Sequence, residues 1–283
     1  MPKSGSNASS TTNTMGSTLP ALPVGIVTVT GASTAMGKST FADLTASYFQ
    51  AAKVGVHTMR IETGRRRAEF SERNSFIDLD EAGKAASAVG GEASLLDFYW
   101  PKIKVGLNGG RVVVIDCGAG AQNLLMRMAG PSGLPGLVAA RGARFWMVVM
   151  TTLDPESARQ AAVLIGDVAY WMPGVEILLA LNHTSPTQWP GLDTPQARAV
   201  AAILDPLQVR RIEIPFCGGQ ALAAFADSGR TFHEILRATP EQLMRWSGKG
   251  ELSALSAQAH LAAWWRAIVD QLAVVWPFAA PNR

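Results

Sequence analysis

The chain has few cysteines, few charged residues and no long apolar segment. Its 283 residues include two cysteines, Cys117 and Cys217, which are too few for a disulfide framework, so we expect reduced thiols and a cytoplasmic location. No apolar run approaches the roughly 20 residues that a helix needs to cross a bilayer. Charged residues make up 17% and hydrophobic residues 48%, which predicts a folded globular protein and excludes a disordered one.

The N-terminal stretch lacks the features of a targeting segment. It is rich in Ser, Thr, Gly and Asn and has no apolar core flanked by basic residues, so we expect no signal peptide. The sequence predicts a flexible tail over residues 1–22 and one domain over residues 23–283 that ends in a helical segment. The net charge of +3 and the pI near 9.0 are compatible with an anionic partner but do not require one.

Short apolar runs alternate with segments of helical spacing along the chain. This order predicts an α/β fold with a mostly parallel sheet covered by helices on both faces. Ligands of such sheets bind at the carboxyl ends of the strands. The predicted strands are residues 25–30, 54–61, 111–116, 144–150, 175–182 and 210–215.

The segments between these strands are less regular. Helical spacing over residues 92–107 is interrupted by Pro101, and the glycine- and proline-bearing stretch 129–142 predicts a loop. The Arg-rich stretch 62–74 predicts an exposed loop or the start of a helix.

The loop after the first predicted strand carries the residue types of a phosphate-binding loop. Glycine at Gly37 lets the backbone amides turn inward, Lys38 can reach the β- and γ-phosphates, and the hydroxyl of Ser39 can bind Mg²⁺. The predicted helix behind the loop favours an anion at its N-terminus. In the usual spacing G-x-x-x-x-G-K-[ST], the first glycine falls on Ala32, with Gly31 one residue earlier. The sequence therefore predicts a variant phosphate loop.

The predicted strand 111–116 ends in an acidic residue that glycines follow. Asp116 is a candidate ligand of Mg²⁺ through water, and Gly118 and Gly120 would let the next loop move. Taken alone, Asp116 is equally compatible with an ordinary strand-to-turn aspartate.

With these motifs in this order, the chain resembles the ParA/MinD group of P-loop ATPases over residues 25–236. That family writes its loop K-G-G-x-G-K-[ST]-[ST]. The family's early lysine, which reaches the nucleotide of the partner subunit, falls on Ser33, and this departure bears on both dimer contact and hydrolysis. The family's loop corresponds here to Ser33, Thr34, Ala35, Met36, Gly37, Lys38, Ser39 and Thr40.

The resemblance implies roles for residues beyond the loop. Glu62 would orient the attacking water or the Mg²⁺ shell, although a solvated surface glutamate is the alternative. Asn182 would read adenine, and Pro215 and Phe216 would lie against the base. The implied set is Lys38, Glu62 and Asp116 for catalysis, Ser39 and Asp116 for the metal, and Gly31, Ser33, Thr34, Ala35, Met36, Gly37, Lys38, Ser39, Thr40, Gly118, Asn182, Pro215 and Phe216 for the nucleotide.

The resemblance also implies an activity and partners. The protein would bind MgATP, form a homodimer on it, and hydrolyse it slowly with stimulation by a partner. It would position or segregate cargo, with plasmid DNA partition or mobilisation as the leading use. Its partners would be an adaptor protein on DNA or cargo and DNA bound without sequence preference, to which the basic run 65–67 would contribute. The Trp-rich C-terminal segment has few basic residues, so we expect it to pack on the sheet instead of on a membrane.

Two alternatives stay open. The loop TGASTAMGKS also fits the spacing of dethiobiotin synthetase, an ATP-dependent ligase, but Met59 and Cys117 replace two functional side chains of that family. The other alternative is a nucleotide-binding switch that hydrolyses little ATP, which the serine at Ser33 favours.

Overall fold

The computed structural model describes residues 24–33, 36–62, 75–78, 93–118, 121–188, 191 and 193–277. The predicted tail 1–22 and the basic run 65–67 lie outside the described residues.

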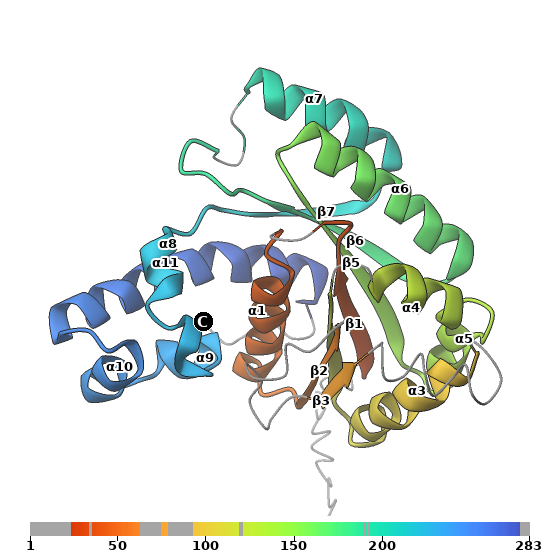
Figure 1. Ribbon diagram of the computed structural model, residues 1–283, viewed down its shortest axis with the longest axis horizontal. Coiled ribbons are helices and arrows are strands. Elements are labelled where there is room, and N and C mark those ends of the chain that lie inside the picture. Colours follow the sequence, from red (N-terminus) through yellow and green to blue (C-terminus); the bar gives the residue numbers. More distant parts are fainter. Residues whose placement is uncertain are drawn as a thin grey trace, which may run out of the picture.

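A seven-stranded sheet forms the centre of the molecule (Figure 1). Its strand order is β3-β2-β4-β1-β5-β6-β7, and every pairing is parallel. The strands are β1 (Gly25–Thr30), β2 (Val56–Glu62), β3 (Ser75–Asp78), β4 (Val112–Cys117), β5 (Arg144–Thr152), β6 (Glu176–Asn182) and β7 (Arg210–Ile214). The predicted α/β fold is confirmed, and the six predicted strands are present within two residues of their expected ends. The four-residue strand β3 was not predicted.

Helices cover both faces of this sheet (Figure 1). One face packs against α1 and α8–α11, and the other packs against α3–α7. The helices are α1 (Lys38–Ala51), α3 (Ala93–Asn108), α4 (Ala121–Ala129), α5 (Leu134–Ala139), α6 (Pro155–Trp171), α7 (Pro195–Leu204), α8 (Gly219–Ala223), α9 (Phe232–Leu236), α10 (Pro240–Ser247) and α11 (Glu251–Val275), with 3₁₀ turns η2 (Asp205–Leu207) and η3 (Ala226–Ser228).

Two local predictions are wrong. The stretch 129–142 is not a continuous loop, because α5 begins after Gly133 with a proline in its first turn and buries Leu134 and Val138. The interruption expected at Pro101 is also absent, since α3 continues through that residue. Pro101 is exposed to solvent, where its ring does not disturb the core.

The C-terminal helix α11 packs on the sheet, as predicted. It buries Trp264, Ile268, Leu272 and Val275 at helical spacing against the face that also carries α1. The next residue, Trp276, is fully buried, and its carbonyl accepts a hydrogen bond of 2.9 Å from the Tyr48 hydroxyl of α1. In the part of the chain that the structure describes, no helix combines the length and apolar character needed to cross a membrane.

Candidate functional site

The loop between β1 and α1 has an open helix N-terminus. Gly37 occupies the N-cap with φ of 84°, a left-handed conformation that favours glycine, and α1 has neither a side-chain cap nor an acidic residue in its first turn. The first amides of the helix are therefore available for an anion. A side-chain carbon at Gly37 would lie 2.8 Å from Nδ2 of Asn182, so this position also has no room for one.

Lys38 lies at the start of α1 and points back along the loop. Its side chain is buried, and Nζ donates to the carbonyl oxygen of Ser33. Burial lowers the pKa of Lys38, and the acidic groups of Asp116, Cys117 and Glu62 oppose that shift. The geometry places a lysine where it can exchange a backbone carbonyl for a phosphate oxygen.

Strands β2 and β4 bring two carboxylates to the same end of the sheet. Asp116 is 8% exposed and hydrogen-bonds the Ser39 side chain of α1. Burial raises the pKa of Asp116, whereas Arg60, the Ser39 hydrogen bond and Lys38 act in the opposite direction and Glu62 adds to the rise. The acidic partner of the predicted metal site is thus in contact with its predicted hydroxyl partner.

Arg60 joins the two carboxylates. Its Nε lies 3.2 Å from Oδ2 of Asp116 and 3.5 Å from Oε2 of Glu62. Arg60 and Asp116 are register partners on the paired strands β2 and β4. With Lys38, the four side chains carry two positive and two negative charges in their usual ionisation states, and Asp43 of α1 is a further acidic group that interacts with Asp116 and Arg60.

Glu62 occupies the last position of β2, close to the loop after β4. The amide of Gly118 donates to the carbonyl oxygen of Ile61 at 2.7 Å, and a side-chain carbon at Gly118 would lie 2.7 Å from Cγ of Glu62. The missing side chain at Gly118 therefore lets Glu62 approach the loop that follows Asp116. Oε2 of Glu62 is buried and makes no hydrogen bond in the described structure.

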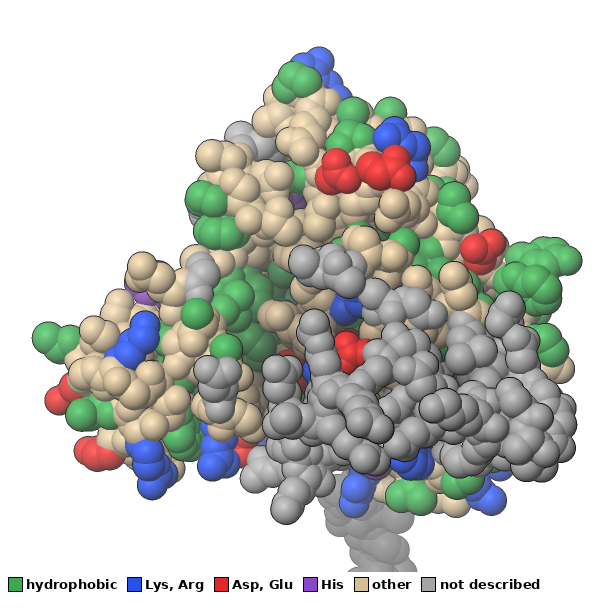
Figure 2. All heavy atoms as spheres, in the orientation of Figure 1, with side chains coloured by type: hydrophobic (Ala, Val, Ile, Leu, Met, Phe, Trp, Pro, Cys, Tyr) green, Lys and Arg blue, Asp and Glu red, His purple; other side chains and the backbone are tan. Residues whose placement is uncertain are grey.

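A pocket of about 220 Å³ adjoins the phosphate loop. It lies between the first turns of α1, the ends of β6 and β7, and α11, and the face drawn in Figure 2 shows hydrophobic side chains lining a recess over the region of α1. Its size suits a ring system better than a whole nucleotide, because typical ligand pockets span about 300–1,000 Å³. Its lining includes the predicted residues Gly37, Thr40, Asn182, Pro215 and Phe216.

Asn182 makes a contact that the sequence did not predict. Its Nδ2 donates to the carbonyl oxygen of Met36 at 3.0 Å, so the side chain that would read a base also holds the phosphate loop. Met36 is buried, and its sulfur lies 3.0 Å from the place that a side-chain carbon at Gly31 would occupy. Met36 and Asn182 thus link the loop to the buried core and to the end of β6.

A second and larger hollow, of about 560 Å³, lies at the free edge of β7 and is open to solvent. Asp205, Arg211, Glu213 and Gln271 are among its lining residues, and none of the predicted site residues is. The smaller pocket is the better candidate because it lies at the carboxyl ends of the strands beside the loop.

The residues present fit Mg²⁺. The hydroxyl of Ser39 and the carboxylate of Asp116 are hard oxygen donors in mutual contact, and Mg²⁺ in nucleotide sites is held by one or two carboxylates together with phosphates and water. The described residues contain no cluster of three or more histidine, cysteine, aspartate or glutamate side chains that could hold a metal without a nucleotide.

The structure brings most of the predicted site residues together. Thr34 and Ala35 lie outside the described residues. Around the loop and the adjoining pocket lie Gly31, Ser33, Met36, Gly37, Lys38, Ser39, Thr40, Glu62, Asp116, Gly118, Asn182, Pro215 and Phe216. The sequence did not predict two residues of the site, namely Arg60, which pairs with both carboxylates, and Trp264 of α11, which lines the pocket. Arg60 lies two residues before Glu62 on a strand, so the two share a face, and that spacing was the available signal.

Replacing Arg60 with glutamine tests the charge balance of the site. We expect a loss of about 1–2 kcal/mol in the free energy of unfolding at neutral pH, less than for a fully buried pair because the three side chains keep 11–22% exposure. Without Arg60 the pKa of Asp116 rises further above that of the unfolded chain. The penalty therefore grows as pH rises through the folded-state pKa of Asp116 in the parent, which lies above 3.8, and shrinks on acidification.

Urea unfolding at about pH 7.5 and about pH 4.5 measures this difference. Arg159→Gln is the matched control, since its pair with Glu156 is 60% exposed on both sides and contributes little. An equal loss for Arg60→Gln at both pH values would contradict a role in neutralising Asp116.

Comparisons with known proteins give structural likenesses only. No protein-family model matches the chain. No curated protein sequence matches it either. The solved structures that resemble it include McdA of Cyanothece in complex with ATP, with 12% identity and a TM-score of 0.49 over 87% of this chain and 96% of that one.

Two further solved structures that resemble this chain are described as members of the group that its sequence resembles. The MinC:MinD cell division complex of Aquifex aeolicus has 16% identity and a TM-score of 0.47 over 85% of this chain and 96% of that one. A ParA family ATPase of Chlorobium tepidum has 14% identity and a TM-score of 0.47 over 86% and 98%. Identities and TM-scores this low carry no conclusion about activity.

Proposed function

We propose that this protein is a ParA/MinD-type ATPase that binds MgATP in the loop between β1 and α1 and hydrolyses it slowly. One observation carries the proposal. Lys38 and Ser39 begin a helix with an open N-terminus, and they contact or face the carboxylates that end β2 and β4. A nucleotide base would enter the adjoining pocket, with Pro215 and Phe216 on one side and Asn182 on the other.

In this proposal the side chains of the site have distinct tasks. The amides of the first turn of α1 and the ammonium of Lys38 bind the β- and γ-phosphate oxygens, and the same ammonium stabilises the charge of the transition state. Ser39 and Asp116 hold Mg²⁺, which when bound supplies further neutralisation of the phosphates. Glu62 orients the attacking water from the end of β2, and the absence of a side chain at Gly118 leaves room for the Glu62 side chain.

The alternatives find unequal support. A switch with little hydrolysis is favoured by Ser33 at the place of the family's lysine and by Arg60, which is paired with both carboxylates. The ligase alternative gains no support, because Met59 and Cys117, which replace two functional side chains of that family, are both buried in the core.

The proposed use is to position or segregate cargo in the cytoplasm, with plasmid DNA partition or mobilisation as the leading case. The protein would form a homodimer on MgATP and meet an adaptor protein on its cargo. DNA would be bound through phosphates without sequence preference, and the binding would weaken with salt. This part of the proposal rests on the resemblance of the sequence motifs.

Phosphate release from MgATP by the purified protein, with and without duplex DNA, tests the proposal, and Lys38→Ala serves as the blank. We expect slow turnover that DNA accelerates. Turnover that matches the Lys38→Ala blank under both conditions, while ATP still binds, would overturn the ATPase and leave the switch.

A further inference from the structure

Helix α11 follows the part of the chain that resembles the ATPase family, yet one of its side chains reaches the pocket beside the phosphate loop. Nε1 of Trp264 donates a hydrogen bond of 2.7 Å to the carbonyl oxygen of Pro215. Trp264 is 8% exposed and lines the pocket together with Pro215 and Phe216. The loop after β7 is therefore held by a residue 49 positions later in the chain.

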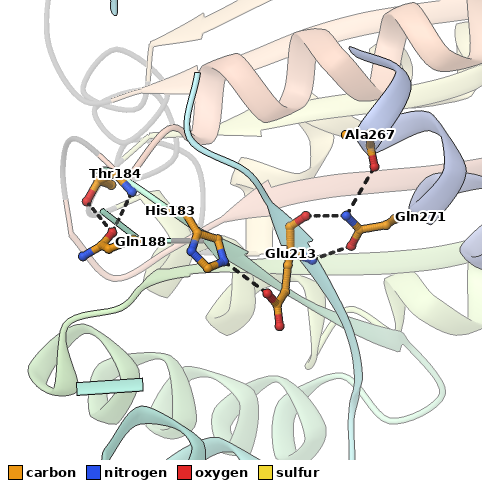
Figure 3. Close-up of polar contacts among 6 residues, drawn as sticks. All are labelled: His183, Thr184, Gln188, Glu213, Ala267 and Gln271. Carbon is orange, nitrogen blue, oxygen red and sulfur yellow. Dashed lines mark hydrogen bonds and ion pairs between the residues drawn. The ribbon is translucent and has the colours of Figure 1, made fainter. Parts of the chain in front are cut away.

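A second residue on the same side of α11 holds β7 itself. Gln271 lies seven positions after Trp264, two helical turns on. Its Oε1 accepts from the amide of Glu213 at 2.7 Å, and its Nε2 donates to the Glu213 carbonyl at 2.6 Å (Figure 3). Because β7 is an edge strand, this side-chain amide takes the place of a neighbouring strand's peptide group.

The contacts continue from β7 to β6. The Glu213 carboxylate lies 3.2 Å from Nε2 of His183, and Figure 3 shows Glu213 between Gln271 and His183. His183 directly follows Asn182, lines the same pocket, and donates its backbone amide to Ile214 at 3.0 Å. The ends of β6 and β7 and the loop after β7 are thus connected to α11 by side-chain hydrogen bonds.

We propose that α11 forms part of the base subsite and that Trp264 is a positioning residue for the base of a nucleoside triphosphate. This inference rests on the proposed nucleotide binding and adds the element that shapes the base side of the site. The Trp264 N–H fixes the Pro215 carbonyl, so the wall of the pocket is formed before a ligand arrives. A wall formed in advance raises affinity by removing the ordering cost of binding. In the described structure the Trp264 indole hydrogen-bonds Pro215 on the base side of the site and not the phosphate loop, so we expect the phosphate side to be less affected.

Trp264→Phe removes the indole N–H and keeps an aromatic ring. We expect its affinity for MgATP to fall about tenfold, the effect of one hydrogen bond, while its affinity for magnesium tripolyphosphate, which has no base, stays within about twofold of the parent. Isothermal titration calorimetry measures both ligands. Trp265→Phe is the matched control, because Trp265 is the next residue of the same helix, is half-buried and does not line the pocket. It should bind both ligands as the parent does.

Gln271→Met provides a second variant in case Trp264→Phe is unstable. It keeps the length and helix preference of the side chain and removes the amide that holds Glu213. We expect the same pattern, with weaker MgATP binding and unchanged tripolyphosphate binding. The inference would be overturned if a folded variant lost affinity equally for MgATP and tripolyphosphate. It would also be overturned if a folded variant bound MgATP like the parent.

The two proposals fail differently. If the parent does not bind MgATP, or if Lys38→Ala binds it equally well, the proposed nucleotide site is wrong and the inference falls with it. If Lys38→Ala loses MgATP while Trp264→Phe and Trp265→Phe both bind like the parent, only the role of α11 is overturned.

Discussion

Replacing Lys38 with alanine is expected to weaken MgATP binding by about 100-fold or more. Loss of one partner of a buried, hydrogen-bonded charge pair costs roughly 2–5 kcal/mol, and about 1.4 kcal/mol corresponds to a factor of ten. Lys38 is buried at the first position of α1 and donates to a carbonyl of the same loop, so its ammonium already lies beside the open helix N-terminus. Isothermal titration calorimetry with MgATP measures the change.

Lys104→Ala controls for the loss of a positive charge. Lys104 is exposed on α3, which covers the opposite face of the sheet from α1, so the variant should bind MgATP like the parent. Binding by Lys38→Ala within a few-fold of the parent would rule out the phosphate loop as the nucleotide site.

Replacing Glu62 with glutamine is expected to lower ATP turnover by about 100-fold or more while MgATP affinity changes by only a few-fold. A positioned carboxylate that handles a proton or water in the transition state contributes about 10²–10⁴ in rate. Glutamine has the same shape as glutamate and keeps the close packing against Gly118. Phosphate release at saturating MgATP measures the rate, and calorimetry measures the affinity.

Glu156→Gln is the control for this substitution, because Glu156 is 60% exposed on α6 and pairs with its helix neighbours Arg159 and Gln160. If Glu62→Gln hydrolyses ATP as fast as Glu156→Gln, Glu62 has no catalytic role. The same variant also tests the proposed homodimer, since slow turnover should preserve the ATP-bound state. Light scattering with ATP should then show a doubled mass, and a monomeric mass would count against dimerisation on ATP.

The regular elements were predicted well where one physical signal dominated. Strands β1, β4 and β5 are apolar runs buried almost throughout in a parallel sheet, and burial of that kind requires a continuous run of apolar residues. Strands β2 and β7 contain charged residues and alternate buried with partly exposed positions. Strand β3 has four residues and lies at the sheet edge, so its sequence shows no comparable run. Helix α5 was missed because glycine and proline are common in loops. Here Gly133 and Pro135 begin a helix, and its side chains Leu134 and Val138 are buried.

The candidate site likewise contains residues whose arrangement was predictable from the sequence and a contact that was not. Gly37, Lys38 and Ser39 are neighbours in sequence, and their conformation follows from a strand, a tight loop and a helix, so their arrangement was predictable. The sequence did not predict that Asn182 also donates to the carbonyl of Met36, 146 residues earlier, because β6 and the loop meet only in the folded chain.

By itself, the sequence determined the parallel α/β fold, the glycine-containing loop between β1 and α1, and the acidic residues near the ends of β2 and β4, because each depends on local pattern or on a shared strand end. Only the tertiary structure decided that Arg60 bridges Asp116 and Glu62 and that Trp264 of α11 holds Pro215. Those contacts join residues 56 and 49 positions apart in two of the three cases. No local pattern encodes such pairs, since they depend on which strands become neighbours and on which face a distant helix packs.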